Sequence, residues 1–461
     1  MDDFTGHRAA RTLFLILGVS LCLRVFLVLA GGTLYLPDES QYTRARIAAD
    51  AALSGDPGGF LDQLRYADHF GNTVVFAIPA AIAKAVWPSP KTPALLFTLF
   101  GVLNIWLVWK IALRAGAARR EALAAAFLLS ASTTFFYYAR HLLPYDLSVT
   151  FGLLALLVAL RESPSNRDSC TCGLLSSASF LIYPGYWTLA GFALLVHAFF
   201  ASREARAVIR RAVLSGSCLV APFAAITLLD ALFGGNLFLQ FIWFTHSITQ
   251  GVYAEGWRLP VEYLWYAEHF LFVLWVAALA YCLWEARRGA LPTSAAIGLA
   301  GVLFVYGTLV LFSVGLEKFV VYGRLVRQCV PFFCLLTAHA LERLARSPAF
   351  GRKPLAAIYV LILIQAGVNF QHPLTQIFPA NFKARAEAIV AQRPEGNYDL
   401  VYAGYIYPVP KKLSLQPHKI VLEAPHPLGF LPYQYEGYTP EERAKIRAAD
   451  IRMRLIRYPD P

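Results

Sequence analysis

The residues best suited to chemistry follow the first long apolar run of the chain. Asp38 and Glu39 are adjacent carboxylates, and residues Ser40–Leu53 have the pattern of a helix that lies along a membrane surface. A carboxylate placed here could take a proton from a weak nucleophile such as a hydroxyl. Asp38 could also cap the helix, with Gln41 returning the hydrogen bond. The two roles are compatible, and the sequence leaves both open.

A second group of polar residues lies in the turn at residues 137–146. Arg140, His141 and Asp146 place a cation, an imidazole and a carboxylate within seven residues. This combination suits an anionic head group. The alternative is an ordinary turn whose arginine extends toward the membrane surface.

A third group is cationic and lies near a later turn. Lys318, Arg324 and Arg327 could hold a phosphate, because arginine offers a two-pronged donor that matches phosphate oxygens. Lipid head groups are the alternative ligands. Arg24 lies inside the first apolar run, where a charge is costly unless it is paired or faces a cavity.

Apolar runs of membrane-spanning character must position these residues. Crossing the hydrocarbon core takes roughly 17–25 residues of helix, and the runs are continuous rather than alternating, which favours helices over barrel strands. The expected spans are Thr12–Leu34, Ala94–Leu113, Ala122–Tyr137, Asp146–Leu160, Cys172–Ile182, Tyr186–Phe200, Ala212–Phe233, Tyr263–Trp284, Ser294–Val314, Val326–Leu341 and Leu355–Phe370.

Basic residues orient these spans. Arginines cluster in every second loop, provided that the short apolar stretch Asn72–Trp87, which contains Pro79 and Lys84, makes no net crossing. The positive-inside rule then places the N-terminus and these loops in the cytoplasm. We therefore expect Asn72–Trp87 to be re-entrant or interfacial. Asp38 and the C-terminal tail are expected outside, in a protein of the inner (plasma) membrane.

Composition supports a membrane protein. The chain has 461 residues, of which 57% are hydrophobic and only 15% charged, whereas soluble domains carry about 25% charged residues. The formal net charge of +12 comes mostly from loops between apolar runs, so we expect no nucleic-acid partner. The seven cysteines lie in or beside apolar runs, so no disulfide framework is predicted.

The tail differs from the rest of the chain. Residues 372–461 alternate short helical and strand patterns, which predicts a small extracytoplasmic α/β domain after a transmembrane domain of residues 1–371. The expected fold class is an all-α polytopic membrane protein with about 11–12 transmembrane helices, followed by this α/β domain.

The Pro-Asp-Glu-x-x-Tyr pattern of residues 37–42, after a first span with an internal arginine, resembles the GT-C glycosyltransferases. More narrowly, it is similar to the branch that contains the aminoarabinose lipid A transferases and the protein O-mannosyltransferases. The turn 140–146 and the stretch 324–331 resemble later motifs of this branch. Two departures are Gln41, where the aminoarabinose transferases carry an arginine, and Phe70-Gly71-Asn72-Thr73, in place of a lysine-proline-proline motif.

The resemblance implies transfer of a sugar from a polyprenyl phosphate to a lipid, glycan or protein outside the cytoplasm. It implies Asp38 as the catalytic base with Glu39 beside it, in an inverting reaction. A divalent metal on Asp38, Glu39 or Asp146 stays an open alternative, and no other cofactor is expected. The candidate donor-phosphate ligands are Arg65, His69, Arg140, His141, Lys318, Arg324 and Arg327, and the candidate acceptor residues are Tyr42, Arg44 and Asp146.

A lipid or sugar transporter or flippase is the main alternative function. Arg24 and the proline-interrupted stretch around Pro79 would suit such a protein. No inverted repeat is evident, however, and the charged clusters lie at one face rather than at the midplane. These features favour the transferase.

Overall fold

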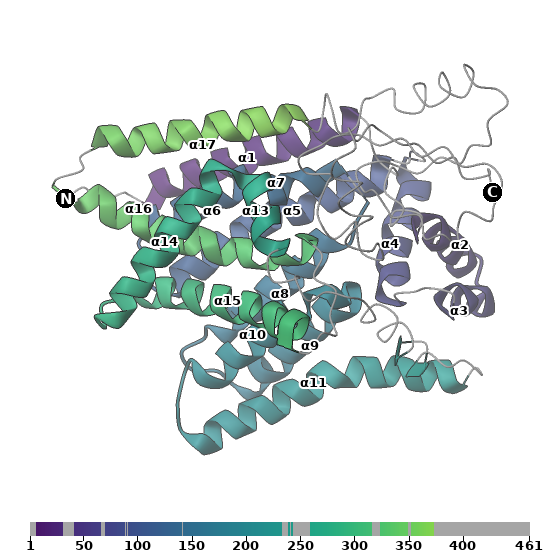
Figure 1. Ribbon diagram of the computed structural model, residues 1–461. Coiled ribbons are helices and arrows are strands. Elements are labelled where there is room, and N and C mark those ends of the chain that lie inside the picture. Colours follow the sequence, from purple (N-terminus) through teal and green to yellow (C-terminus); the bar gives the residue numbers. More distant parts are fainter. Residues whose placement is uncertain are drawn as a thin grey trace, which may run out of the picture.

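The protein is described here by a computed structural model that covers residues 6–30, 41–65, 70–87, 89, 91–140, 142–232, 238–239, 241–242, 259–315, 323–348 and 352–372. These residues form helices and short connections, without β-strands (Figure 1). The first half contains α1 (Gly6–Ala30), α2 (Gln41–Leu53), α3 (Pro57–Arg65), α4 (Phe70–Val86), α5 (Lys91–Arg114), α6 (Arg119–Ala131), α7 (Thr133–Phe136), η2 (Tyr137–Arg140) and α8 (Tyr145–Ala159). The second half contains α9 (Asn166–Ile182), η3 (Pro184–Tyr186), α10 (Trp187–Phe199), α11 (Ala205–Leu232), α13 (Leu259–Glu268), α14 (Phe270–Arg287), α15 (Thr293–Val310), η4 (Leu311–Gly315), η5 (Gly323–Cys329), α16 (Val330–Arg346) and α17 (Arg352–His372).

The helical architecture confirms the polytopic fold class. Among the described residues, six helices are long and apolar enough to cross a membrane: those at Gly6–Leu29, Lys91–Arg114, Ala205–Leu232, Phe270–Arg287, Thr293–Val310 and Lys353–Phe370. The chain is therefore a multi-pass membrane protein. The predicted α/β domain at residues 372–461 lies, but for His372, outside the described residues.

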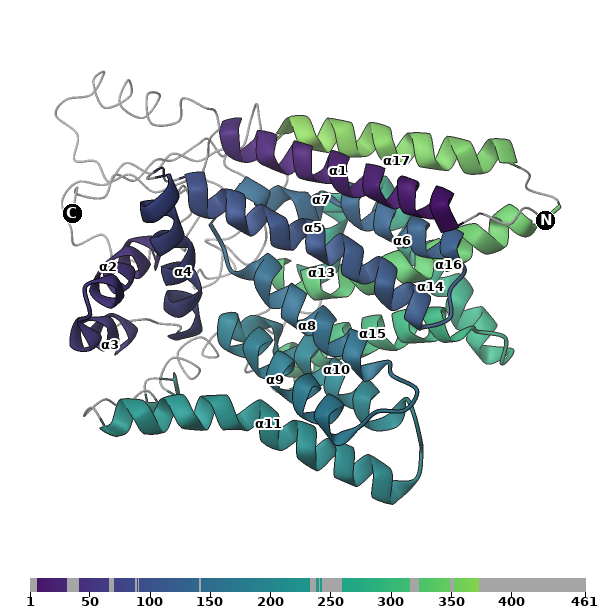
Figure 2. The same cartoon turned by 180° about the vertical axis from the view of Figure 1, so that it is seen from behind.

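The long helices run side by side, with α1 and α17 along one flank and α11 along the other (Figures 1 and 2). Helices α2, α3 and α4 gather at one end of the bundle, where α1 ends and α5 begins. Helix α2 confirms the predicted helix at Ser40–Leu53. Helix α4 runs across the direction of α5 in both views, which is consistent with a segment that makes no net crossing.

One buried carboxylate ends a predicted span early. The run Ala122–Tyr137 was expected to be one helix, but α6 ends at Ala131 and α7 begins at Thr133. Glu268 lies in this break and accepts hydrogen bonds from the Ser132 hydroxyl (2.6 Å) and from the backbone N–H groups of Thr133 (3.1 Å) and Thr134 (2.7 Å). The carboxylate thus supplies the N-terminal cap of α7 from a distant part of the chain.

The prediction of one continuous helix at Tyr263–Trp284 is also wrong. This stretch is divided at His269, whose φ of 41° is rare for a residue other than glycine, into α13 and α14. The side-chain oxygen of Gln365 in α17 accepts a hydrogen bond from the Leu271 N–H at 3.0 Å. A free N–H at the start of α14 is thereby satisfied by a side chain of another helix.

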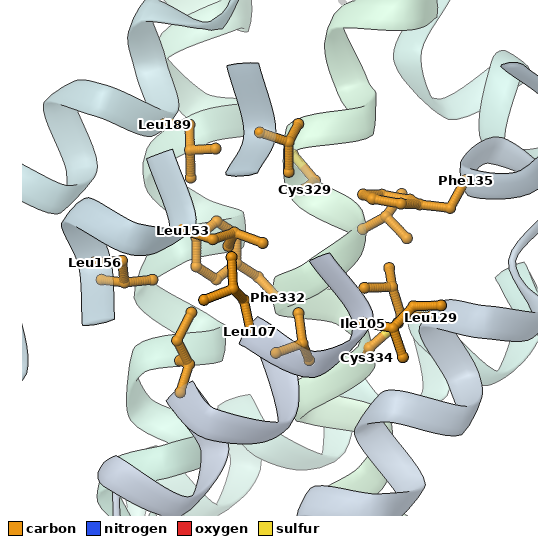
Figure 3. Close-up of a cluster of buried hydrophobic side chains, with 14 of the residues drawn as sticks. Ile105, Leu107, Leu129, Phe135, Leu153, Leu156, Leu189, Cys329, Phe332 and Cys334 are labelled. Atoms are coloured by element: carbon orange, nitrogen blue, oxygen red, sulfur yellow. The ribbon is translucent and has the colours of Figure 1, made fainter. Parts of the chain in front are cut away.

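The centre of the bundle is apolar and closely packed. Phe332 is fully buried and lies among Leu107, Leu153 and their neighbours (Figure 3). A Cβ atom on Gly301 of α15 would lie only 2.4 Å from the Phe332 ring, so the missing side chain permits this approach of α15 to α16. Small residues serve the same purpose in many membrane proteins, because association in lipid depends on close packing.

Gln328 fixes the position of η5, the short 3-10 helix before α16. Its side-chain oxygen accepts hydrogen bonds from the Thr188 hydroxyl (2.7 Å) and the Leu189 N–H (3.0 Å). Its side-chain nitrogen donates to the carbonyls of Gly185 (3.1 Å) and Leu325 (3.0 Å). Gln328 is fully buried, and three of these bonds hold η5 against η3 and the start of α10, while the fourth lies within η5.

We predict that Gln328→Leu destabilises the protein strongly. Leucine has a similar size, but it removes four hydrogen bonds, three of them buried, and a buried polar group left without a partner costs about 1–3 kcal/mol. Thermal unfolding in detergent should show a clearly lower midpoint for this variant than for Gln365→Leu, which removes one hydrogen bond. Equal midpoints for the two variants would contradict the role given to Gln328.

Candidate functional site

Several residues predicted from the sequence lie outside the described residues. These are the two candidate catalytic carboxylates, Asp38 and Glu39, and the candidate phosphate ligands His69, His141 and Lys318. For four more residues the structure gives the helix but not the side chain: Arg44 lies in α2, Arg65 ends α3, Arg140 ends η2 and Arg324 lies in η5. Their roles stay predictions.

The structure brings together two residues that the sequence placed in separate motifs. Arg327 of η5 forms a short ion pair with the carboxylate of Asp146, in the first turn of α8. Arg327 is fully buried and Asp146 is 6% exposed. The guanidinium of Arg327 also lies over the ring of Phe135, with 4.4 Å between its central carbon and the ring centroid.

Arg24 joins this pair from α1. The backbone carbonyl of Phe135 accepts a hydrogen bond from Nη1 of Arg24 (3.0 Å) and another from Nη2 of Arg327 (3.2 Å). Nε of Arg24 donates to the Ser20 hydroxyl at 3.2 Å. Arg24 is 1% exposed, and both Asp146 and Arg327 lie close enough to act on it electrostatically. We call Arg24, Asp146 and Arg327 the charge cluster.

Gly101 of α5 makes room for the cluster. A Cβ atom at this position would lie 2.7 Å from Nη1 of Arg24 and 3.2 Å from Oδ2 of Asp146. The side chain of Asn104, one turn further along α5, donates to the backbone carbonyl of Asp146 at 2.9 Å. The Thr150 hydroxyl donates to the same carbonyl at 2.8 Å. Helix α5 therefore accommodates the charged groups and holds the start of α8.

Counted over the described residues, the charge cluster carries an excess positive charge. It contains two guanidinium groups and one carboxylate, and Nη2 of Arg24 has no hydrogen-bond partner among the described residues. A buried cation is stable only when it is paired, so an excess of one charge favours the binding of an anion. The cluster is chemically suited to a phosphate or another small oxyanion.

The other two predictions for this region concern a metal and the acceptor. The described part of the chain contains no group of three side chains suited to a metal, and Asp146, one candidate ligand, is bonded to Arg327. The other candidates, Asp38 and Glu39, lie outside that part, so the metal stays an open alternative. Tyr42, predicted to contact the acceptor, is 6% exposed and packs in the apolar core.

An apolar crevice reaches the charge cluster from the side of the bundle. It has a volume of about 430 Å³ and is bounded by α1, α6 and α17, with Arg24 and Ser20 among its few polar groups. Leu15, Val19 and Leu363 line it and are 67%, 50% and 55% exposed, so its mouth lies on the apolar outer surface of the helices. A chain of hydrocarbon could enter it from the bilayer and end beside a cation.

We predict unequal effects on stability for two neutralising substitutions. Asp146→Asn leaves two buried cations without their carboxylate, and removal of one partner of a buried pair costs about 3–5 kcal/mol. Arg24→Gln removes the excess cation and leaves one neutral pair, so its stability should be close to that of the unmodified protein. Thermal unfolding of both variants in detergent tests this; a loss in Arg24→Gln as large as in Asp146→Asn would contradict the charge count.

Solved structures of other proteins are similar to this chain, although no similar sequence is found. No protein-family profile and no curated protein sequence matches the chain. Among solved structures it is similar to ArnT, the aminoarabinose lipid A transferase from Cupriavidus metallidurans. The apo form gives a TM-score of 0.54 at 14% identity, covering 97% of each chain, and the form bound to undecaprenyl phosphate gives 0.53 at 14% identity, covering 96% of each.

A second similarity is weaker. The oligosaccharyltransferase of Archaeoglobus fulgidus matches with a TM-score of 0.49 at 13% identity over 80% of this chain, which spans 55% of that protein's length. The similarity to ArnT, in contrast, extends over nearly the whole chain. It shows that this multi-pass membrane protein has the GT-C fold that its sequence resemblance predicted.

Proposed function

We propose that the protein is a membrane glycosyltransferase that moves a sugar from a polyprenyl-phosphate donor to a lipid, glycan or protein acceptor. The observation that carries the proposal is the excess positive charge of the buried Arg24–Asp146–Arg327 cluster in a GT-C fold. The site is expected at the outer face of the inner membrane, with the N-terminus in the cytoplasm and the C-terminus outside.

The cluster suits the leaving group of such a reaction. When the sugar leaves a polyprenyl phosphate, negative charge develops on the phosphate oxygens. Donors that are already in position stabilise this charge most effectively in a site that excludes water. Arg24 and Arg327 are held by the Phe135 carbonyl, so neither must reorganise as the charge develops.

The apolar crevice suits the lipid part of the donor. Its lining runs along α1 from Leu15 to Leu27, a distance of about 18 Å at 1.5 Å per residue, and Arg24 lies toward the end nearest α2. A polyprenyl chain in the crevice would place its phosphate next to the charge cluster. ArnT, which has the same fold, has been seen with undecaprenyl phosphate.

The acceptor needs a base, and Asp38 is the proposed one. A hydroxyl is a weak nucleophile, so a positioned carboxylate that takes its proton speeds the attack. The first described residue after Asp38 is Gln41, which begins α2, and α2 lies at the end of the bundle where α1 ends. One base and no covalent intermediate would invert the anomeric centre. Glu39 would orient the acceptor or hold a metal.

We predict that Asp38→Asn abolishes sugar transfer without loss of folding. Asparagine keeps the size and can still accept a capping hydrogen bond, so α2 should survive. It cannot take a proton, and general base catalysis contributes about 10²–10⁴-fold to a rate. The measurement is transfer from defined polyprenyl-phosphate sugars by the purified protein, together with thermal unfolding of Asp38→Asn and Asp38→Ala.

The two roles of Asp38 give opposite patterns. If it only caps α2, Asp38→Asn should be active and Asp38→Ala mainly less stable. An active and normally stable Asp38→Asn protein would contradict the proposed mechanism. Lipid or sugar movement across liposomes without any transfer by the unmodified protein would instead support the transporter alternative.

A further inference from the structure

A second cavity lies at the opposite end of the bundle from the charge cluster. It has a volume of about 260 Å³ and lies between the starts of α9 and α11, under the loops that follow α8 and α10. Its polar lining includes Ser169 of α9, Ser202 of the loop, and Arg210 and Arg211 of α11. No step of the proposed transfer reaction uses these residues.

Arg211 has an unused buried donor in the wall of this cavity. The side chain is 7% exposed and is held by two backbone carbonyls, since Nε donates to Ala207 (3.2 Å) and Nη2 to Ser202 (2.9 Å). Its Nη1 is buried without a hydrogen-bond partner among the described residues. Buried polar groups of a cation are rarely left unsatisfied, which points to an anion outside the described residues.

The charges around the cavity leave a positive excess. Arg161 is paired with Asp168, in the first turn of α9 before its apolar run. Burial opposes ionisation of Asp168, but hydrogen bonds from Ser165 and the attraction of Arg161 hold its pKa below the ordinary value, so it is charged at neutral pH. Arg210 is bonded to the neutral amide of Asn166 (2.9 Å). The lining contains two cations, Arg210 and Arg211, and one carboxylate, that of the exposed Glu162.

The surroundings identify the kind of anion. Ile209 and Val213 of α11 lie on either side of the two arginines in sequence and are 62% and 60% exposed, so the apolar outer surface of a membrane-spanning helix begins at the cavity. A volume of about 260 Å³ is smaller than the roughly 300–1,000 Å³ of pockets for larger ligands. The site fits a phosphate group whose apolar chains lie along α11.

We propose that this cavity binds the phosphate head group of an anionic phospholipid in the leaflet opposite to the transfer site. Basic pockets between transmembrane helices are known to bind such head groups. The ligand would accept a hydrogen bond from Nη1 of Arg211 and neutralise the excess charge. The lipid would thereby join the start of α11 to the start of α9 and to the loops that follow α8 and α10.

The test is lipid binding by the full-length protein in a nonionic detergent. Phosphatidylglycerol, phosphatidylcholine and inorganic phosphate are each titrated, and apparent affinity is taken from the rise in unfolding temperature, because a ligand of the folded state stabilises it. We expect phosphatidylglycerol to stabilise the protein at the lowest concentration. Arg211→Gln should weaken that affinity roughly ten- to hundredfold, as expected for one lost charge-assisted hydrogen bond.

Two more variants keep the test decisive. Ala207→Leu fills the cavity without a change of charge and leaves the backbone carbonyl that holds Arg211, so it should also weaken phosphatidylglycerol binding. Arg206→Gln removes the same charge from an exposed position outside the cavity and should bind nearly as the unmodified protein does. Equal losses in Arg206→Gln and Arg211→Gln, or normal binding by Ala207→Leu, would overturn the site. Stabilisation by inorganic phosphate equal to that by the lipid would overturn the lipid assignment.

Discussion

The ion pair between Arg327 and Asp146, with Arg24 beside it, is the interaction on which the arrangement of α1, α8 and η5 depends. Charged groups inside a membrane protein are costly unless they are paired or hydrogen-bonded. Here the cost is met by parts of the chain that are distant in sequence: α1 supplies one cation, η5 the other, α8 the carboxylate, and Phe135 a shared carbonyl. Each of these segments must keep its place for the others to remain paired.

This constraint explains features that packing alone does not. Helix α5 carries Gly101 where any side chain would press on the Arg24 guanidinium. Gln328, next to Arg327, makes four hydrogen bonds that fix η5. Within the part of the chain that the structure describes, the cluster still holds two cations for one carboxylate, and that imbalance connects the fold to the proposed chemistry. A phosphate that binds there would complete the charge balance, and the apolar crevice beside Arg24 would take its lipid.

Much of the helical fold could be predicted from the sequence, because the length of an apolar run is a local signal. The helix after the first span was also predicted, as was the cost of Arg24 unless it is paired or faces a cavity. The partner itself was not, since Arg24 and Asp146 are more than a hundred residues apart. The breaks at Ser132 and His269 also escaped, because Glu268 and Gln365 satisfy the free backbone groups from other helices. The role of Gly101 was not predicted, because a glycine in an apolar helix does not indicate which side chains pack against it.

The most direct test of the account is the donor dependence of sugar transfer in Arg24→Gln, with Arg24→Lys as the charge-conserving control. If Arg24 holds the donor phosphate, Arg24→Gln should fold normally and lose roughly ten- to hundredfold in kcat/KM for the polyprenyl-phosphate donor, the value of one charge-assisted hydrogen bond. Arg24→Lys should retain part of the activity. A folded Arg24→Gln protein that uses the donor as well as the unmodified protein would contradict the claim that the charge cluster binds phosphate.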